Sequence, residues 1–168
     1  MEVKGAALLY TLATLGITFA GFSALLLIIR QTAGGSLSAL DRFLTRTLVG
    51  HLTLLAATAL LPAILALYDV TEVWIWKVSA LAFGLPMLAL LLTYQRRRAA
   101  ITGRRAPPIV AAIFIWVATF SIIAMIGYVF GNFEHPAAAY VSALTVTFVT
   151  TAYAFVMALE VILSQQAK

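Results

Sequence analysis

The chain has 168 residues, of which 63% are hydrophobic and only 10% are charged, and its mean hydropathy is +1.03. This composition excludes a water-soluble fold, because a soluble core needs more polar surface to cover it. The net charge is +5, but the basic residues lie in short connections between apolar stretches, which is typical of membrane orientation and not of nucleic-acid binding. The absence of cysteine excludes disulfides and thiolate metal sites. We therefore expect a protein whose main partner is the lipid bilayer, with no nucleic acid bound.

Five stretches are long and apolar enough to cross a hydrocarbon core of roughly 30 Å as helices of about 20 residues. They lack the alternation of barrel strands, and a chain in lipid must satisfy its backbone internally. The first stretch also exceeds the apolar part of a signal peptide. We predict an all-α fold, a polytopic transmembrane bundle of about five spans in a single integral membrane domain over residues 1–168. The predicted spans are residues 5–29, 47–68, 73–94, 109–131 and 137–163.

The connection after the first span is predicted to contain a short helix. Ser38 and Asp41 have the spacing of a capping box, which begins a helix. Three leucines nearby recur at steps of three and four residues, which gives the segment one apolar face. We therefore predict an interfacial helix over residues 37–46 that lies on the membrane surface.

The basic residues are distributed unevenly over the two sides of the predicted bundle. Nine of the 11 Lys and Arg residues fall on one side, and Lys4 and Lys77 fall on the other. The positive-inside rule predicts that the N-terminus is outside and the C-terminus is cytoplasmic. Compactness and the bias toward Ala, Leu and Arg favour a bacterial inner membrane. Aromatic residues near the outer ends of the spans are expected to form an interfacial belt; they are Tyr68, Trp74, Trp76, Tyr128 and Tyr140.

The third connection, which is predicted to begin at Gln95, carries a cluster of arginines. Topology determination alone explains this cluster. Binding of anionic lipids or of an acidic partner is the alternative, because each charge near a membrane surface contributes about 1 kcal/mol. The cluster consists of Arg96, Arg97, Arg98, Arg104 and Arg105.

Ionisable groups inside membrane spans are costly and are therefore functional candidates. His51 and Glu160 each lie about one turn inside a predicted span, at a depth similar to that of Arg30 and Arg46. This candidate polar cluster could form a proton relay or an anion-binding vestibule. The alternative is anchoring, with arginines that reach lipid headgroups and a histidine that bonds a neighbouring helix. The other histidine, His135, is predicted to lie a membrane thickness away, so we expect neither a shared metal nor a haem, and no cofactor.

Small residues on the first span recur at the spacing that lets two helices approach closely. This helix-packing face comprises Ala13, Gly16, Ala20 and Ala24. Threonines follow neighbouring positions of the first and fifth spans. They either line a polar pathway between these spans or bond to carbonyls of their own helix, and packing is the favoured explanation.

The sequence lacks a phosphate loop, a zinc-binding HExxH motif, a nucleophile elbow and a paired-carboxylate site, so we expect no enzyme. The leading hypothesis is a non-enzymatic membrane protein, an interaction or assembly subunit that packs with itself as a homo-oligomer or with another membrane protein. The alternative is a small channel or transporter for an ion or small solute, with a pathway between the two threonine stripes. A continuous polar cavity reaching the middle of the membrane would favour the alternative, and a dry interior would favour the subunit.

Overall fold

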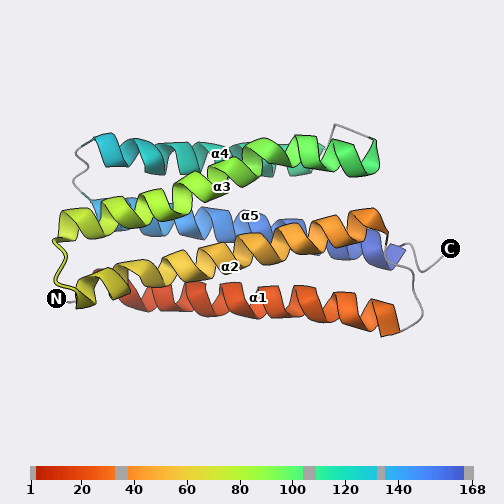
Figure 1. The fold of residues 1–168 in the computed structure, drawn as a ribbon, viewed down its shortest axis with the longest axis horizontal. Helices are drawn as coiled ribbons and strands as arrows, with labels where there is room; N and C mark the ends of the chain where they lie inside the picture. Colours follow the sequence, from red (N-terminus) through yellow and green to blue (C-terminus); the bar gives the residue numbers. More distant parts are fainter. Residues whose placement is uncertain (1–2, 33–37, 104–108, 132–134, 165–168) are drawn as a thin grey trace.

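The structure, a computed structural model, describes residues 3–32, 38–103, 109–131 and 135–164, apart from the side chains at some helix positions. The described chain consists of five α-helices without strands, which confirms the predicted all-α bundle. The helices run back and forth along one axis, so the two termini lie at opposite ends (Figure 1). In chain order they are α1 (Ala6–Thr32), α2 (Ala39–Leu67), α3 (Glu72–Thr102), α4 (Ile109–Phe130) and α5 (Pro136–Ser164).

Four of these helices, α1, α2, α3 and α5, are long and apolar enough to cross a membrane. Helix α4 has 22 residues. Its fully described part, Ile115–Phe130, forms a shorter apolar helix. The lengths and the composition of the helices are those of a membrane-embedded protein.

Helix α2 begins earlier than the predicted second span. Ser38 caps it: the Asp41 N–H donates to Ser38 Oγ at 3.1 Å, and the Ser38 N–H donates to Asp41 Oδ2 at 3.0 Å. The predicted capping box is therefore confirmed. The separate interfacial helix over residues 37–46 is wrong, because no glycine or proline stands between Ala39 and Val49 and residues 39–46 continue directly into the span.

Helix α3 ends later than the predicted third span. It continues to Thr102 and stops at Gly103, whose φ of 66° is the left-handed conformation that glycine adopts at a helix end. The prediction began a connection at Gln95 because charge follows it, but a helix can leave the membrane without ending. Arg96, Arg97 and Arg98 consequently lie on a helix.

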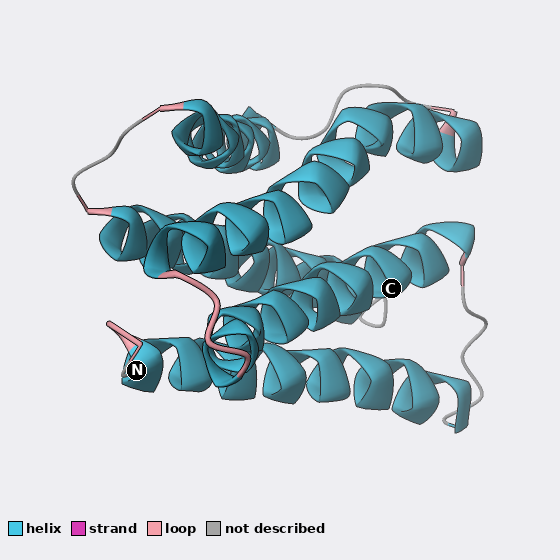
Figure 2. Ribbon diagram, turned by 60° about the vertical axis from the view of Figure 1, so that its left-hand side comes forward, coloured by secondary structure: helices cyan, strands magenta, loops and turns pink. Residues whose placement is uncertain are grey.

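Helix α5 packs against all four other helices, whereas α4, as far as the described residues show, packs against α3 and α5. Figure 2 shows the five helices as one elongated bundle. Large side chains fully buried in the bundle come from every helix, and they include Leu9, Leu55, Phe83, Met87, Ile122 and Leu144. The interior is therefore filled by apolar side chains from all five helices.

A hydrogen bond from a neighbouring helix replaces a backbone hydrogen bond that α2 lacks. Pro62 has no N–H, so the carbonyl of Thr58, four residues earlier, cannot receive its helical hydrogen bond. The buried hydroxyl of Tyr140 on α5 donates to this carbonyl at 2.7 Å. The ring of Trp76 on α3 lies 5.8 Å from the Tyr140 ring. Three helices therefore meet where the backbone of α2 lacks a donor of its own.

The predicted interfacial belt of aromatic residues is only partly present. Tyr68 and Trp74 are exposed at the surface, but Trp76, Tyr128 and Tyr140 are at most 4% exposed and belong to the core. The expectation was wrong for these three, because depth along a span does not reveal which side of a helix faces lipid.

Candidate functional site

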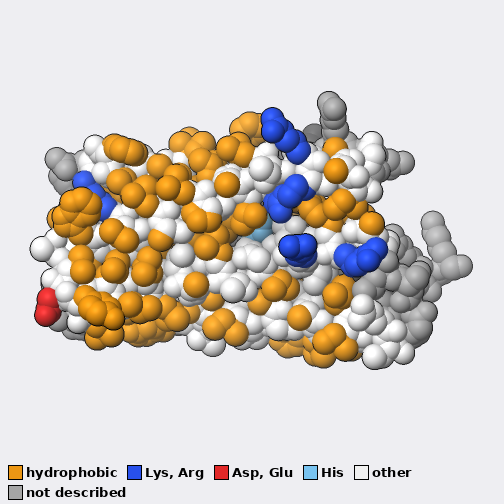
Figure 3. Space-filling view, in the orientation of Figure 1, with side chains coloured by type: hydrophobic (Ala, Val, Ile, Leu, Met, Phe, Trp, Pro, Cys, Tyr) orange, Lys and Arg blue, Asp and Glu red, His pale blue; other side chains and the backbone are white. Residues whose placement is uncertain are grey.

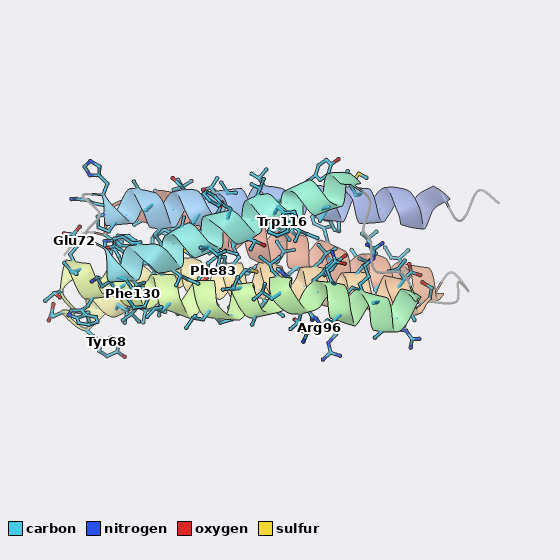
Figure 4. All side chains as sticks on the ribbon, turned by 90° about the horizontal axis from the view of Figure 1, so that it is seen from above. Tyr68, Glu72, Phe83, Arg96, Trp116 and Phe130 are labelled. Carbon is cyan, nitrogen blue, oxygen red and sulfur yellow. The ribbon has the colours of Figure 1, made fainter. Side chains whose placement is uncertain are left out.

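Basic side chains gather at the end of the bundle where α2 begins and α3 ends, which we call the arginine end. Figure 3 shows Lys and Arg side chains over this half of α2 and α3, with a histidine among them. Arg96 is exposed and points away from the bundle (Figure 4). Two members of the predicted arginine cluster, Arg104 and Arg105, lie outside the described residues.

The structure describes half of the predicted polar cluster. Arg46 is exposed on α2, and His51 is buried on the same helix. They are five residues apart, which corresponds to about 140° around the helix, so they face different directions. The side chains of Arg30 and Glu160 lie outside the described residues, so their place in a cluster stays a prediction.

His51 is fixed to its own helix. Its Nδ1 lies 2.7 Å from the carbonyl oxygen of Thr47, one turn earlier. A carbonyl can only accept, so Nδ1 carries the proton and donates, which leaves Nε2 as the acceptor of the neutral ring. We expected this histidine to bond a neighbouring helix. Its Nδ1 instead bonds its own helix, so the expectation is wrong for this nitrogen.

Arg97 is the residue at this end that sequence reasoning did not single out from its neighbours. Its side chain folds back along α3, and Nη2 donates to the carbonyl oxygen of Leu90 at 3.0 Å. Its Nε is buried and has no hydrogen-bond partner among the described residues. Side chains on a helix point toward its N-terminus, so an arginine near the C-terminal end of α3 starts out directed toward the middle of the bundle.

Two aromatic rings flank this arginine. The Phe43 ring of α2 lies 5.7 Å from the Tyr94 ring of α3, and the guanidinium carbon of Arg97 lies 5.9 Å from the centre of the Phe43 ring. Such a distance permits a cation–π interaction. Tyr94 and Arg97 are three residues apart and therefore share a helix face. This spacing could have identified the pair from sequence if α3 had been predicted to continue past Gln95.

Described basic side chains outnumber described acidic ones at this end of the bundle. Arg42, Arg46, Arg96 and Arg97 form no ion pair with any acid that the structure describes. Asp41, the described acid nearest in sequence to Arg42, is buried and accepts a hydrogen bond in the capping box. The arrangement can attract and hold an anion.

The predicted helix-packing face is used mainly inside the chain. Ala13 and Gly16 are buried, Ala20 is half-buried and Ala24 is exposed. A Cβ added at Gly16 would lie 3.1 Å from the carbonyl oxygen of Leu52, so α1 and α2 approach closely here. The face therefore joins α1 to α2 at Gly16, whereas its last member, Ala24, stays exposed.

The opposite end of the bundle has a cavity of about 600 Å³ where α1, α3 and α5 begin. Lys4 and Glu72 form an ion pair of 3.7 Å beside it, with both side chains largely exposed. His135 also contributes to the lining, which is otherwise mostly apolar. An exposed pair of this kind contributes little to stability.

Comparisons with protein families, with curated proteins and with solved structures found no match to this chain.

Proposed function

We propose that this protein is a non-enzymatic membrane subunit that associates with copies of itself or with another membrane protein. We also propose that the arginine end faces the cytoplasm of a bacterial inner membrane, which the concentration of basic residues at that end supports.

The observation that supports this proposal best is the filled interior of the bundle. Residues from all five helices are almost fully buried at its centre, including Leu55, Phe83, Ile122 and Leu144. A conduction pathway would instead need polar groups around a cavity that reaches this depth. A centre packed with apolar side chains suits a protein that acts through its outer surface.

The threonines give a second line of support. Thr11 and Thr14 of α1 are exposed, whereas Thr147 and Thr151 of α5 are buried, so the two stripes do not face each other. Each hydroxyl donates to a carbonyl of its own helix, as Thr147 does to Ala143 at 2.8 Å. These donors are already satisfied within their helices and are not positioned for a solute.

Reconstitution of the purified full chain into liposomes tests the proposal. We expect that the flux of protons, potassium and chloride, followed with enclosed dyes, equals that of protein-free vesicles. Site-specific photocrosslinkers on exposed positions such as Ile17 and Phe120, used in native membranes, should give discrete protein–protein adducts, and one at the buried Leu144 should not. Flux above background that is lost in His51→Ala would overturn the proposal in favour of a channel or transporter. Crosslinks to lipid alone would overturn the proposed association with another copy or another membrane protein.

A further inference from the structure

We propose that the arginine end binds the phosphate group of an anionic phospholipid between α2 and α3, with Arg97 as its principal ligand. We call this the lipid-phosphate site, and it consists of Phe43, Arg46, Gly50, Tyr94 and Arg97. Such a site does not depend on self-association or on a protein partner.

The direction of the Arg97 side chain is the first reason. An arginine at a membrane edge ordinarily extends toward water, where its charge is hydrated. Here the guanidinium instead bonds Leu90 O, seven residues and about 10 Å back along α3. Counted from Glu72 at about 1.5 Å per residue, Leu90 lies roughly 27 Å along the helix, at the far edge of a hydrocarbon core of roughly 30 Å. The charge is therefore held at the edge of the hydrocarbon core, directly below the headgroup region in which lipid phosphates lie.

The second reason is that Arg97 keeps donors available. A guanidinium has five N–H donors in a planar fork. Among the described residues the bond from Nη2 to Leu90 O is its one hydrogen bond, and Nε is buried without a partner. Nε is enclosed by the chain, but the remaining N–H groups on Nη1 and Nη2 bond no described residue, and phosphate oxygens can accept bonds from them. A phosphate bound here would satisfy these outer donors of the guanidinium.

The surroundings of the site favour a lipid over a free phosphate. Arg42 and Arg46 add positive charge, and neither forms an ion pair with an acid that the structure describes. Next to Arg46, the exposed face of α2 continues toward the middle of the bundle with Gly50, Thr53 and Ala57. An added Cβ at Gly50 would meet no atom within 4 Å, so the strip beside the site is open. An acyl chain can lie along this strip while its phosphate contacts the arginines.

The test compares lipid preference in the full-length protein. Nanodiscs of phosphatidylcholine with graded amounts of phosphatidylglycerol supply the probe, and native mass spectrometry counts the lipids that remain bound. We expect Arg97→Gln to reduce the preference for phosphatidylglycerol about tenfold and Arg97→Lys to reduce it less, because lysine keeps the charge but loses the fork. Arg96→Gln is the matched control, with the same loss of charge on an adjacent, outward-pointing residue, and should change the preference less than about twofold.

A second pair of variants leaves the charge unchanged. Gly50→Leu should fill the open strip and weaken phosphatidylglycerol retention, whereas Gly127→Leu on α4, where a Cβ also meets no atom within 4 Å, should not. Equal losses in Arg96→Gln and Arg97→Gln would overturn the site in favour of diffuse surface attraction. Displacement of the lipid by inorganic phosphate alone would also overturn it, because the occupant would then be a free anion. Unfolding midpoints in pure phosphatidylcholine establish that each variant is folded.

Discussion

The packed centre of the bundle and its arginine end differ in what their buried groups contribute. In the packed interior, Phe83 and Leu144 are buried among apolar neighbours, and the buried polar groups are uncharged: the Tyr140 hydroxyl has a partner on α2, whereas Trp76 Nε1 and Ser79 Oγ have none among the described residues. At the arginine end, Arg97 carries a charge back along α3 and over the Phe43 ring, and its buried Nε has no hydrogen-bond partner among the described residues. Apolar packing stabilises a fold, whereas burial of a charge costs about as much as its contacts return. We infer that the centre maintains the structure and that the arginine end is kept for binding.

The largest expected effect is at the close contact between α1 and α2. Gly16→Leu should lower the free energy of unfolding by about 3 kcal/mol, because the new side chain must displace the backbone of α2 at Leu52. Gly21→Leu on the same helix is the control and should cost less than about 0.5 kcal/mol, since a Cβ there meets no atom within 4 Å. Reversible unfolding in mixed micelles measures both, and equal losses would contradict the internal role of this face.

Removal of a core ring should have the next largest effect. Phe83→Ala is expected to cost about 2 kcal/mol, below the usual range in water, because in lipid only the packing contribution is lost. Phe120→Ala removes the same ring from a side chain that is 74% exposed, and it should leave the free energy of unfolding nearly unchanged. A similar loss in both variants would mean that Phe120 is covered by another protein or another copy of the chain under the conditions of the measurement.

The hydrogen bond from the Tyr140 hydroxyl to the Thr58 carbonyl of α2 predicts a smaller effect, which depends on the presence of Pro62. Tyr140→Phe should cost about 1.5 kcal/mol, because it leaves the Thr58 carbonyl without a donor in the core. Pro62→Ala restores the missing N–H, so in that background the same change should cost only about 0.5 kcal/mol. A double-mutant cycle on unfolding free energies measures this difference. Additive losses would show that the hydroxyl does not substitute for the missing backbone donor.

The smallest expected effect on stability belongs to the arginine end. Arg97→Gln should change the free energy of unfolding in phosphatidylcholine by less than about 0.5 kcal/mol, because relief of the charge burial offsets the lost cation–π contact. Thermal unfolding at fixed lipid composition checks this expectation. A loss comparable to that of Phe83→Ala would assign the arginine a structural role.

Sequence reasoning predicted well which stretches form helices, but it predicted poorly which side chains of these helices are buried. Long apolar stretches identify membrane helices, and the Ser38–Asp41 pair identified a helix start, although this start belongs to α2 and not to the separate interfacial helix that was predicted. Lipid and protein interior are both apolar, however, so hydrophobic periodicity could not distinguish the exposed Trp74 from the buried Trp76. The fold-back of Arg97 also escaped prediction, because it depends on α3 continuing past the point where the sequence becomes hydrophilic. Helix ends defined by charge alone are therefore the weakest part of such a prediction.

The separation of stability from lipid binding is tested most directly by measuring both quantities for Phe83→Ala and Arg97→Gln in the same nanodiscs. We predict that Phe83→Ala lowers the free energy of unfolding and keeps the preference for phosphatidylglycerol, and that Arg97→Gln does the reverse. If both variants instead lose stability and lipid preference together, the two regions act as one unit and the division of roles proposed for this bundle is contradicted.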